Sequence, residues 1–177
     1  MSASVLPKTW ESLLNSSNFL PVIVKTLERV HDINWSMEPN IHDHFEMVYM
    51  KKGNAVFEIA GHPAPIGPND IIIIKPYQKH KFIVKSESGC DFIVLNFKFE
   101  NRLNKDYSEI SLEDFLNFVN SKETGAFISL KVNQKNDIIV ILDKILKEKE
   151  NNDIGSDFLS HLLVMELFVF ISRALKM

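Results

Sequence analysis

The chain has 177 residues, of which 45% are apolar and 24% are charged, and its formal net charge is -3. This length fits one globular domain, and the charge gives no basic surface for nucleic acid, so we expect no DNA binding by this chain alone. Its single cysteine, Cys90, excludes an internal disulfide and a cysteine-based zinc site. We see no secretory signal and no apolar run long enough for a bilayer, so we expect no membrane contact and a cytoplasmic location.

The first hundred residues have the pattern of short β-strands separated by turns. Apolar, β-rich segments occupy residues 21–30, 45–51, 55–60, 71–75, 81–84 and 91–99. Turn sequences rich in Gly, Pro, Asn and Ser separate them at residues 52–54, 61–63, 66–70 and 86–89. Strands of this length at this spacing predict a β-sandwich or barrel.

The pattern becomes helical after about residue 105. A capping box at residues 111–114 predicts a short helix that ends at Gly125. Residues 127–132 are expected to be extended. Asn136 or Asp137 then caps a second helix, and Ser156 or Asp157 caps a last helix that runs to about Leu175.

The last predicted helix carries two apolar stripes instead of one. The first stripe holds Phe158, Leu162, Met165, Phe168 and Val169, and the second holds Leu159, Leu163, Leu167, Phe170 and Ile171. A surface helix of one domain needs a single apolar face. A central core helix would explain two stripes, but we favour contact of the second stripe with another copy of the chain or with a missing segment, and a symmetric contact between identical helices is the commonest solution. We expect this homodimer contact to be made by Leu159, Leu163, Leu167 and Phe170.

Polar residues that can bind ligands gather at the start of one predicted strand and the end of another. His42, His44 and Glu46 alternate along the chain, so they share one strand face, and His80 follows the 71–75 strand. Met47 and Tyr49 have the opposite parity and are expected to face outward, under the N-terminal arm or the helices. Imidazoles with a carboxylate suit a metal ion, but they also suit the hydroxyls of a small molecule. Spacing alone leaves open a metal site, a small-molecule pocket and a polar rim without a ligand.

These motifs resemble a known family. His42 to Glu46, followed by Gly53, resembles the first cupin signature, and residues 66–76 ending at His80 resemble the second. The order and spacing of these motifs, together with the strand at residues 96–99, are most similar to the sensor domain of AraC-type transcriptional regulators. The resemblance extends over roughly Val22 to Leu175. The resemblance implies a mainly β fold with C-terminal helices: a cupin-like double-stranded β-helix, or jelly-roll barrel, followed by two or three helices.

The same resemblance implies how the chain is divided. Residues 1–104 would form the effector-binding barrel with an N-terminal arm, and residues 105–177 would form a helical dimerisation segment. Such regulators continue into a helix-turn-helix DNA-binding domain, which is missing here, so we expect the sequence to be truncated and DNA to be bound only through that domain.

Two departures from the cupin pattern argue against a metal. Asn40 stands where the first histidine would fall, and Val84 stands where the second signature ends in Asn. We therefore expect no cofactor and favour no metal; if one binds, its ligands would be His42, Glu46 and His80. The resemblance implies an effector, with sugar as the family-level expectation, bound by hydrogen bonds and stacking. The expected lining residues are His42, His44, Glu46, His80, Asn96 and Trp35.

The sequence thus predicts an effector sensor and not an enzyme. The main alternative is a small metal-dependent cupin enzyme, such as an isomerase or a dioxygenase. A purely structural barrel with a dimerising helix is a third reading.

Overall fold

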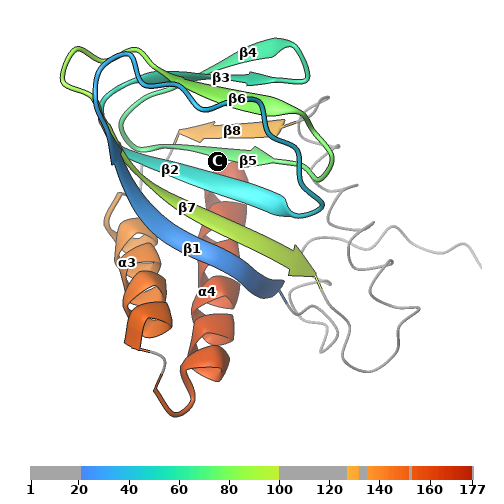
Figure 1. Cartoon of the computed structure of the whole chain (residues 1–177). Coiled ribbons are helices and arrows are strands. Elements are labelled where there is room, and N and C mark those ends of the chain that lie inside the picture. Colours follow the sequence, from blue (N-terminus) through green and yellow to red (C-terminus); the bar gives the residue numbers. More distant parts are fainter. Residues whose placement is uncertain (1–20, 100–126, 132–134, 152, 177) are drawn as a thin grey trace, which may run out of the picture.

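A computed structural model describes residues 21–99, 127–131, 135–151 and 153–176. These residues form eight strands and two helices (Figure 1). The strands are β1 (Pro21–His31), β2 (Phe45–Lys52), β3 (Ala55–Ile59), β4 (His62–Ile66), β5 (Asp70–Ile74), β6 (His80–Val84), β7 (Cys90–Phe99) and β8 (Phe127–Lys131). The helices are α3 (Lys135–Asn151) and α4 (Ser156–Lys176). The helix expected after residue 111 lies outside the described residues.

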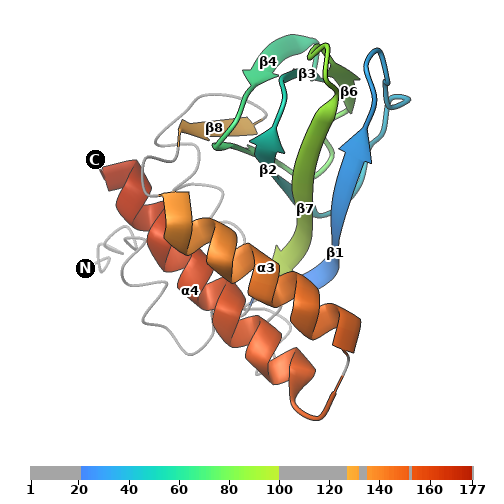
Figure 2. The ribbon, with the colours of Figure 1, turned by 90° about the vertical axis from the view of Figure 1, so that its left-hand side faces the viewer.

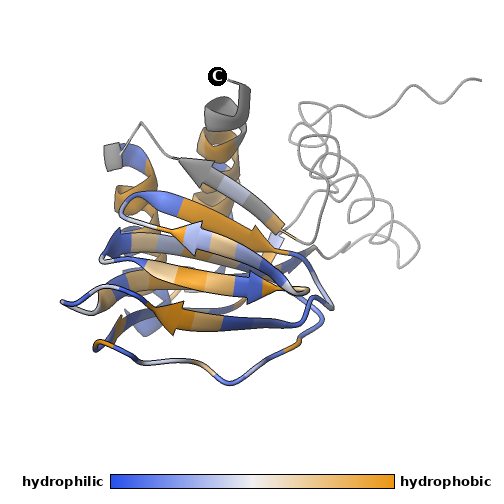
Figure 3. Cartoon of the chain, turned by 90° about the horizontal axis from the view of Figure 1, so that it is seen from above, coloured by the Kyte–Doolittle hydropathy of each residue, from blue (hydrophilic) through white to orange (hydrophobic). Residues whose placement is uncertain are grey.

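The strands form two antiparallel sheets that face each other. The larger sheet has the order β1-β7-β2-β5-β8, and the smaller one has the order β4-β3-β6. Between them lies a buried cluster that includes Phe57 and Phe82 from the small sheet and Ile72 and Phe92 from the large sheet. Hydrophobic and hydrophilic residues alternate along several strands (Figure 3), as expected for sheets with one face in the core. The predicted jelly-roll class is confirmed.

Strand β4 was not expected, because the residues at its two ends, 61–63 and 66–70, have turn-forming sequences. It contains Pro63 and Pro65, which cannot donate backbone hydrogen bonds. The strand pairs only with β3 among the described elements and lies at the edge of its sheet, where a missing donor is tolerated. Its position in the sheet therefore permits a strand that its composition disfavours.

The two helices cover the outer face of the large sheet and form a third layer (Figure 2). A second buried cluster fills this interface and contains Met47 and Tyr49 from β2 together with residues of α3 and α4. Val48 and Met50, with the opposite parity, lie in the cluster between the sheets. The expectation that Met47 and Tyr49 face outward under the helices is thus correct. No described helix is long and apolar enough to cross a membrane.

The expected boundary at residue 104 does not separate the sheets from the helices. Strand β8 comes from the second segment but pairs with β5 along its whole length, from Asp70 opposite Lys131 to Ile74 opposite Phe127. The helices share a core with the large sheet. Strand pairing and a shared core therefore join the described parts of the two segments.

The expected dimer contact on α4 needs a correction. Leu163 and Leu167 are buried in the core under the large sheet, at 7% and 0% exposure. Phe170 is half-buried against the same cluster, and only Leu159 is exposed. At 100° per residue, positions 163, 164, 167, 168 and 171 form one face, which draws on both predicted stripes. Two apolar faces do exist, but the exposed one carries Phe158, Leu159 and Leu162.

Candidate functional site

The site lies at the first residues of β2 and β6. Glu46 is the second residue of β2, His42 precedes that strand, and His80 is the first residue of β6. Backbone hydrogen bonds join the segments that lead into these strands: Asn40 N–H donates to the His80 carbonyl (2.8 Å), and His80 N–H donates to the Asn40 carbonyl (2.9 Å). Tyr77 N–H donates to the His42 carbonyl (2.7 Å). These bonds hold the segment before β2 against the loop between β5 and β6.

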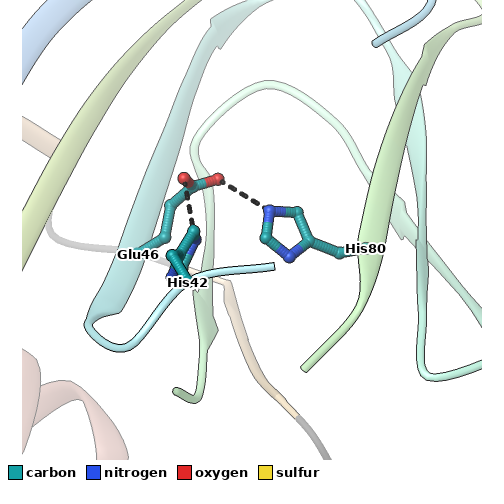
Figure 4. Close-up of side chains that lie close together, drawn as sticks. All are labelled: His42, Glu46 and His80. Atoms are coloured by element: carbon teal, nitrogen blue, oxygen red, sulfur yellow. Dashed lines mark ion pairs between the residues drawn. The ribbon is translucent and has the colours of Figure 1, made fainter. Parts of the chain in front are cut away.

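Three side chains converge at this junction (Figure 4). His42 Nε2 lies 3.4 Å from one oxygen of Glu46, and His80 Nε2 lies 3.8 Å from the other. The side chains are 9%, 12% and 0% exposed for His42, Glu46 and His80. One potential ligand atom from each lies within 4.8 Å of the other two. The sequence prediction that these three residues share a site is therefore supported by their geometry.

The hydrogen bonds of the two Nδ1 atoms show which nitrogen of each imidazole carries the proton. His42 Nδ1 lies 2.8 Å from the His44 carbonyl oxygen, and His80 Nδ1 lies 2.9 Å from the Gln78 carbonyl oxygen. A carbonyl only accepts hydrogen bonds, so each Nδ1 carries the proton and donates it. In a neutral ring, Nε2 then presents a lone pair. Neither Nε2 has a hydrogen-bond partner among the described residues, although both are buried.

The charge of Glu46 affects the nearest imidazole. Burial is the largest single influence and lowers the pKa of His42, but the Glu46 carboxylate, the His44 carbonyl and Asp43 together raise it more, so the net shift is upward. A proton on His42 Nε2 would therefore be favoured in acid, where it would face Glu46. The upward shift brings the protonation of His42 closer to neutral pH, and whenever the ring is neutral its Nε2 is an acceptor.

The sequence of this chain matches a known protein family. A family model described as "AraC-like ligand binding domain" matches residues 23–168. The chain belongs to this family. No curated protein matches the chain.

Several solved structures resemble parts of this AraC-like domain at low identity. A predicted oxalate decarboxylase from Thermotoga maritima is 19% identical, with 42% of this chain and 65% of that one covered and a TM-score of 0.40. Oxalate decarboxylase from Bacillus subtilis is 18% identical, covers 56% of this chain and 26% of that one, and has a TM-score of 0.39. KdgF from Halomonas sp. is 15% identical, with 46% of this chain and 80% of that one covered and a TM-score of 0.37. The domain thus spans about two thirds of the length of the decarboxylase from Thermotoga maritima and about one quarter of the length of the one from Bacillus subtilis.

His44 lies beside the three converging residues in this AraC-like domain. Its ring stacks on His42 with centroids 4.0 Å apart and planes 6° apart. Its Nδ1 lies 3.3 Å from Asp43, which is also paired with Lys98 at 2.7 Å. Burial, together with the neighbouring His42, lowers the pKa of His44, so the outer ring stays neutral more readily than the inner one. We infer that His44 supports His42, both by stacking and through its carbonyl.

Asn96 and Trp35 complete the set of predicted lining residues. Asn96 is the register partner of Glu46 on β7, and cross-strand partners project to the same face. Its Oδ1 is buried without a described hydrogen-bond partner. Trp35 instead stacks on His31 at 3.5 Å, and its carbonyl accepts from Val84 N–H at the far end of β6. Four residues of strand, or about 13 Å, separate that end from His80, so the structure does not bring Trp35 to the site.

Sequence reasoning missed the backbone groups that orient the site. The carbonyls of His44 and Gln78 fix the two rings, but they carry no side-chain signature. Tyr77, which binds the His42 carbonyl, has a φ of 61° and a side chain that is 70% exposed. A bulky residue in the left-handed region costs on the order of 1–2 kcal/mol. The turn therefore carries strain at a point that holds the site together.

Two hollows lie near the barrel. A cavity of about 340 Å³ borders His80 and is lined by Pro39, Glu58, Ala60, Gly61, Lys79, His80 and Lys81. A cavity of about 770 Å³ lies between the β4 and β8 edges and the loop at residues 66–70, and its described lining does not include the three converging residues. The smaller hollow is therefore the one that adjoins the polar site.

Proposed function

We propose that the chain is the effector-sensing and dimerisation domain of an AraC-family transcriptional regulator that acts in the cytoplasm. In this proposal a small molecule, for which we favour a sugar, binds beside Glu46 and controls DNA binding by a helix-turn-helix domain. The proposed role is binding and not catalysis. One observation carries it: four of the six buried, unpartnered side-chain polar atoms in the described part of the chain belong to His42, His44, His80 and Asn96, around Glu46.

The chemistry of these atoms supports a ligand rich in hydrogen-bond donors. Buried polar groups are normally satisfied, so a cluster of unsatisfied acceptors beside one carboxylate calls for a bound partner. The hydroxyl groups of a sugar donate to carboxylate, imidazole and amide acceptors. A carboxylate effector would instead place a second negative charge beside Glu46, and like charges disfavour each other's ionised form.

Strand β2 offers a route from this site to the helices. Glu46 faces the site, whereas its neighbours Met47 and Tyr49 face the core beneath α3 and α4. A ligand that prefers one position of β2 would therefore favour one packing of the helices. Differential affinity of this kind is what shifts a conformational equilibrium. We propose that the helices pass this change to the dimer.

The exposed face of α4 supports the proposed homodimer. Phe158, Leu159 and Leu162 are 70%, 43% and 51% exposed, and they lie on the side of the helix opposite its buried residues. Leu162→Glu should leave a folded monomer in sedimentation, since it places a charge in the middle of that face. Val140→Glu, which changes a residue on α3 with 46% exposure, is the matched control and should remain a dimer.

A thermal-shift screen tests the proposed effector class. Mono- and oligosaccharides and small organic acids would be added to the wild type, to Glu46→Gln, and to the control Glu28→Gln, which alters an exposed ion pair with Lys51 away from the site. A sugar at 100 times its Kd should stabilise the wild type by about 2.7 kcal/mol, or roughly 5–10 °C for a chain of this size. Glu46→Gln should lose this shift, and Glu28→Gln should keep it. Stabilisation by acids alone would refute the proposed ligand class.

A further inference from the structure

We propose that Tyr77 selects the effector by covering it with its aromatic ring, so that the site prefers a cyclic sugar to an open-chain polyol. This inference rests on the proposed sugar-binding role and names the side chain that discriminates among such ligands. The acceptors around Glu46 can satisfy hydroxyl groups, but a sugar ring also presents a face of C–H groups. Trp35, which was expected to cover that face, lies at the far end of β6.

Tyr77 lies in the turn that orients both histidines of the site. Its backbone N–H donates to the His42 carbonyl at 2.7 Å. The carbonyl of the next residue, Gln78, accepts the Nδ1 proton of His80 at 2.9 Å. The turn leads into Lys79 and His80, which line the adjoining hollow of about 340 Å³, a volume in the range of small-molecule sites. The side chain of Tyr77 therefore starts at the edge of the site.

The backbone conformation at this position is unfavourable for a bulky residue. The φ of Tyr77 is 61°, in the left-handed region that glycine and asparagine adopt far more readily. Asn34 and Asn69, with φ of 63° and 66°, show the usual solution within this same chain. Asparagine or glycine at position 77 would keep the N–H bond to His42 with less strain. The backbone geometry therefore does not explain why a tyrosine occupies the turn.

The packing of the Tyr77 side chain does not explain it either. The side chain is 70% exposed, and within the described part of the chain it has no hydrogen bond, ion pair or aromatic contact. An exposed aromatic residue alone would need no explanation. A bulky residue held in a strained conformation beside a buried polar cluster does, because such strain persists where it serves a function. A bound molecule would give the ring the contact that it lacks in the free chain.

The Tyr77 ring and the polar cluster suit two sides of a cyclic sugar. The hydroxyl groups of a pyranose donate to the Glu46 carboxylate and the neighbouring acceptors, while its C–H face packs against the aromatic ring. An alditol has at least as many hydroxyl groups, but it has no rigid C–H face and loses more internal freedom on binding. An aromatic contact corresponds to roughly tenfold in affinity. We therefore expect about a tenfold preference for the sugar over its alditol.

Paired titrations of a sugar and its alditol test the proposal. Each monosaccharide that stabilises the wild type in the thermal-shift screen would be titrated calorimetrically beside its alditol, for example D-glucose beside sorbitol or D-xylose beside xylitol. Tyr77→Phe keeps the ring and should keep the tenfold preference. Tyr77→Asn should bind the two compounds equally, yet its Tm should match or exceed that of the wild type, because asparagine suits this backbone. The control Asn34→Gly changes a left-handed residue in another turn and should keep the preference.

The outcomes separate this inference from the effector proposal. Equal affinity of the wild type for a sugar and its alditol would overturn the role of Tyr77 and leave the sugar site standing. An unchanged preference in folded Tyr77→Asn would do the same. If that variant did not fold, Tyr77→Gly would give the same comparison, since glycine adopts this φ without strain. A wild type that binds no monosaccharide would overturn the effector proposal and, with it, the role of Tyr77.

Discussion

The division of α4 into a core face and an exposed face gives a sharp stability prediction. Leu167 is fully buried between the large sheet and the helices, in contact with the cluster that contains Met47 and Tyr49. Leu167→Ala removes three carbon atoms, which corresponds to a transfer term of about 2.4 kcal/mol at roughly 0.8 kcal/mol per carbon. The cavity left behind adds to it, so the expected loss is about 3–5 kcal/mol. That is a large part of the roughly 5–15 kcal/mol that stabilises a typical domain.

Leu162→Ala is the matched control for this prediction. It makes the same chemical change five residues away on the same helix, where the side chain is 51% exposed. Its expected loss is about 1 kcal/mol or less, because only half of the side chain leaves water on folding. Because the proposed dimer would cover Leu162, urea unfolding of both variants is compared in solutions dilute enough for the chain to be monomeric. An unchanged slope with denaturant would show that the denatured states are comparable.

The result that would refute this reasoning is equally specific. A loss below about 1 kcal/mol for Leu167→Ala would place this residue outside the core. An equal loss for the two variants would mean that both faces of α4 are buried in the chain itself. The proposed dimer face would then have no basis.

Three further predictions concern the barrel. Gly53→Ala should destabilise the fold by at least about 3 kcal/mol, because its φ is +79° and a Cβ would lie 2.2 Å from the Gly89 carbonyl oxygen. Gly61→Ala, with a φ of +82° and open space, should cost only about 1 kcal/mol in the same urea assay. Burial raises the pKa of the Cys90 thiol, so folded protein should react with a thiol reagent far more slowly than denatured protein, and equal rates would contradict this assignment. Burial also raises the pKa of Asp91, so its ionised form opposes folding at neutral pH. Asp91→Asn should therefore stabilise the protein there, and this gain should shrink as the pH falls through the folded pKa and vanish below 3.8; a gain independent of pH would contradict it.

Much of the fold could be read from local pattern. The strands at 21–30, 45–51 and 91–99 appear almost where they were expected, because alternation with period two is visible in sequence. Strand β4 was missed, because two prolines outweigh the short apolar pattern between them. Its tolerance of proline depends on its place at a sheet edge, and no local window contains that information.

The site was predicted only in part. The alternation of His42, His44 and Glu46 correctly indicated a shared face, and the second motif brought in His80. The separation of Trp35 from this group depends on the antiparallel path of residues 35–40 along β6. That pairing joins segments that lie far apart in the sequence, so spacing along the chain could not reveal it.

By itself, the sequence determined the residue types at the site, the strand parity of β2 and the existence of two apolar faces on the last helix. The tertiary structure decided which face of α4 is buried, because the large sheet covers only one side of it. It also decided how the histidines are protonated, since the Nδ1 partners are backbone carbonyls placed by the fold. Residue types follow from the sequence, but the direction of a lone pair depends on what the other side of the ring touches.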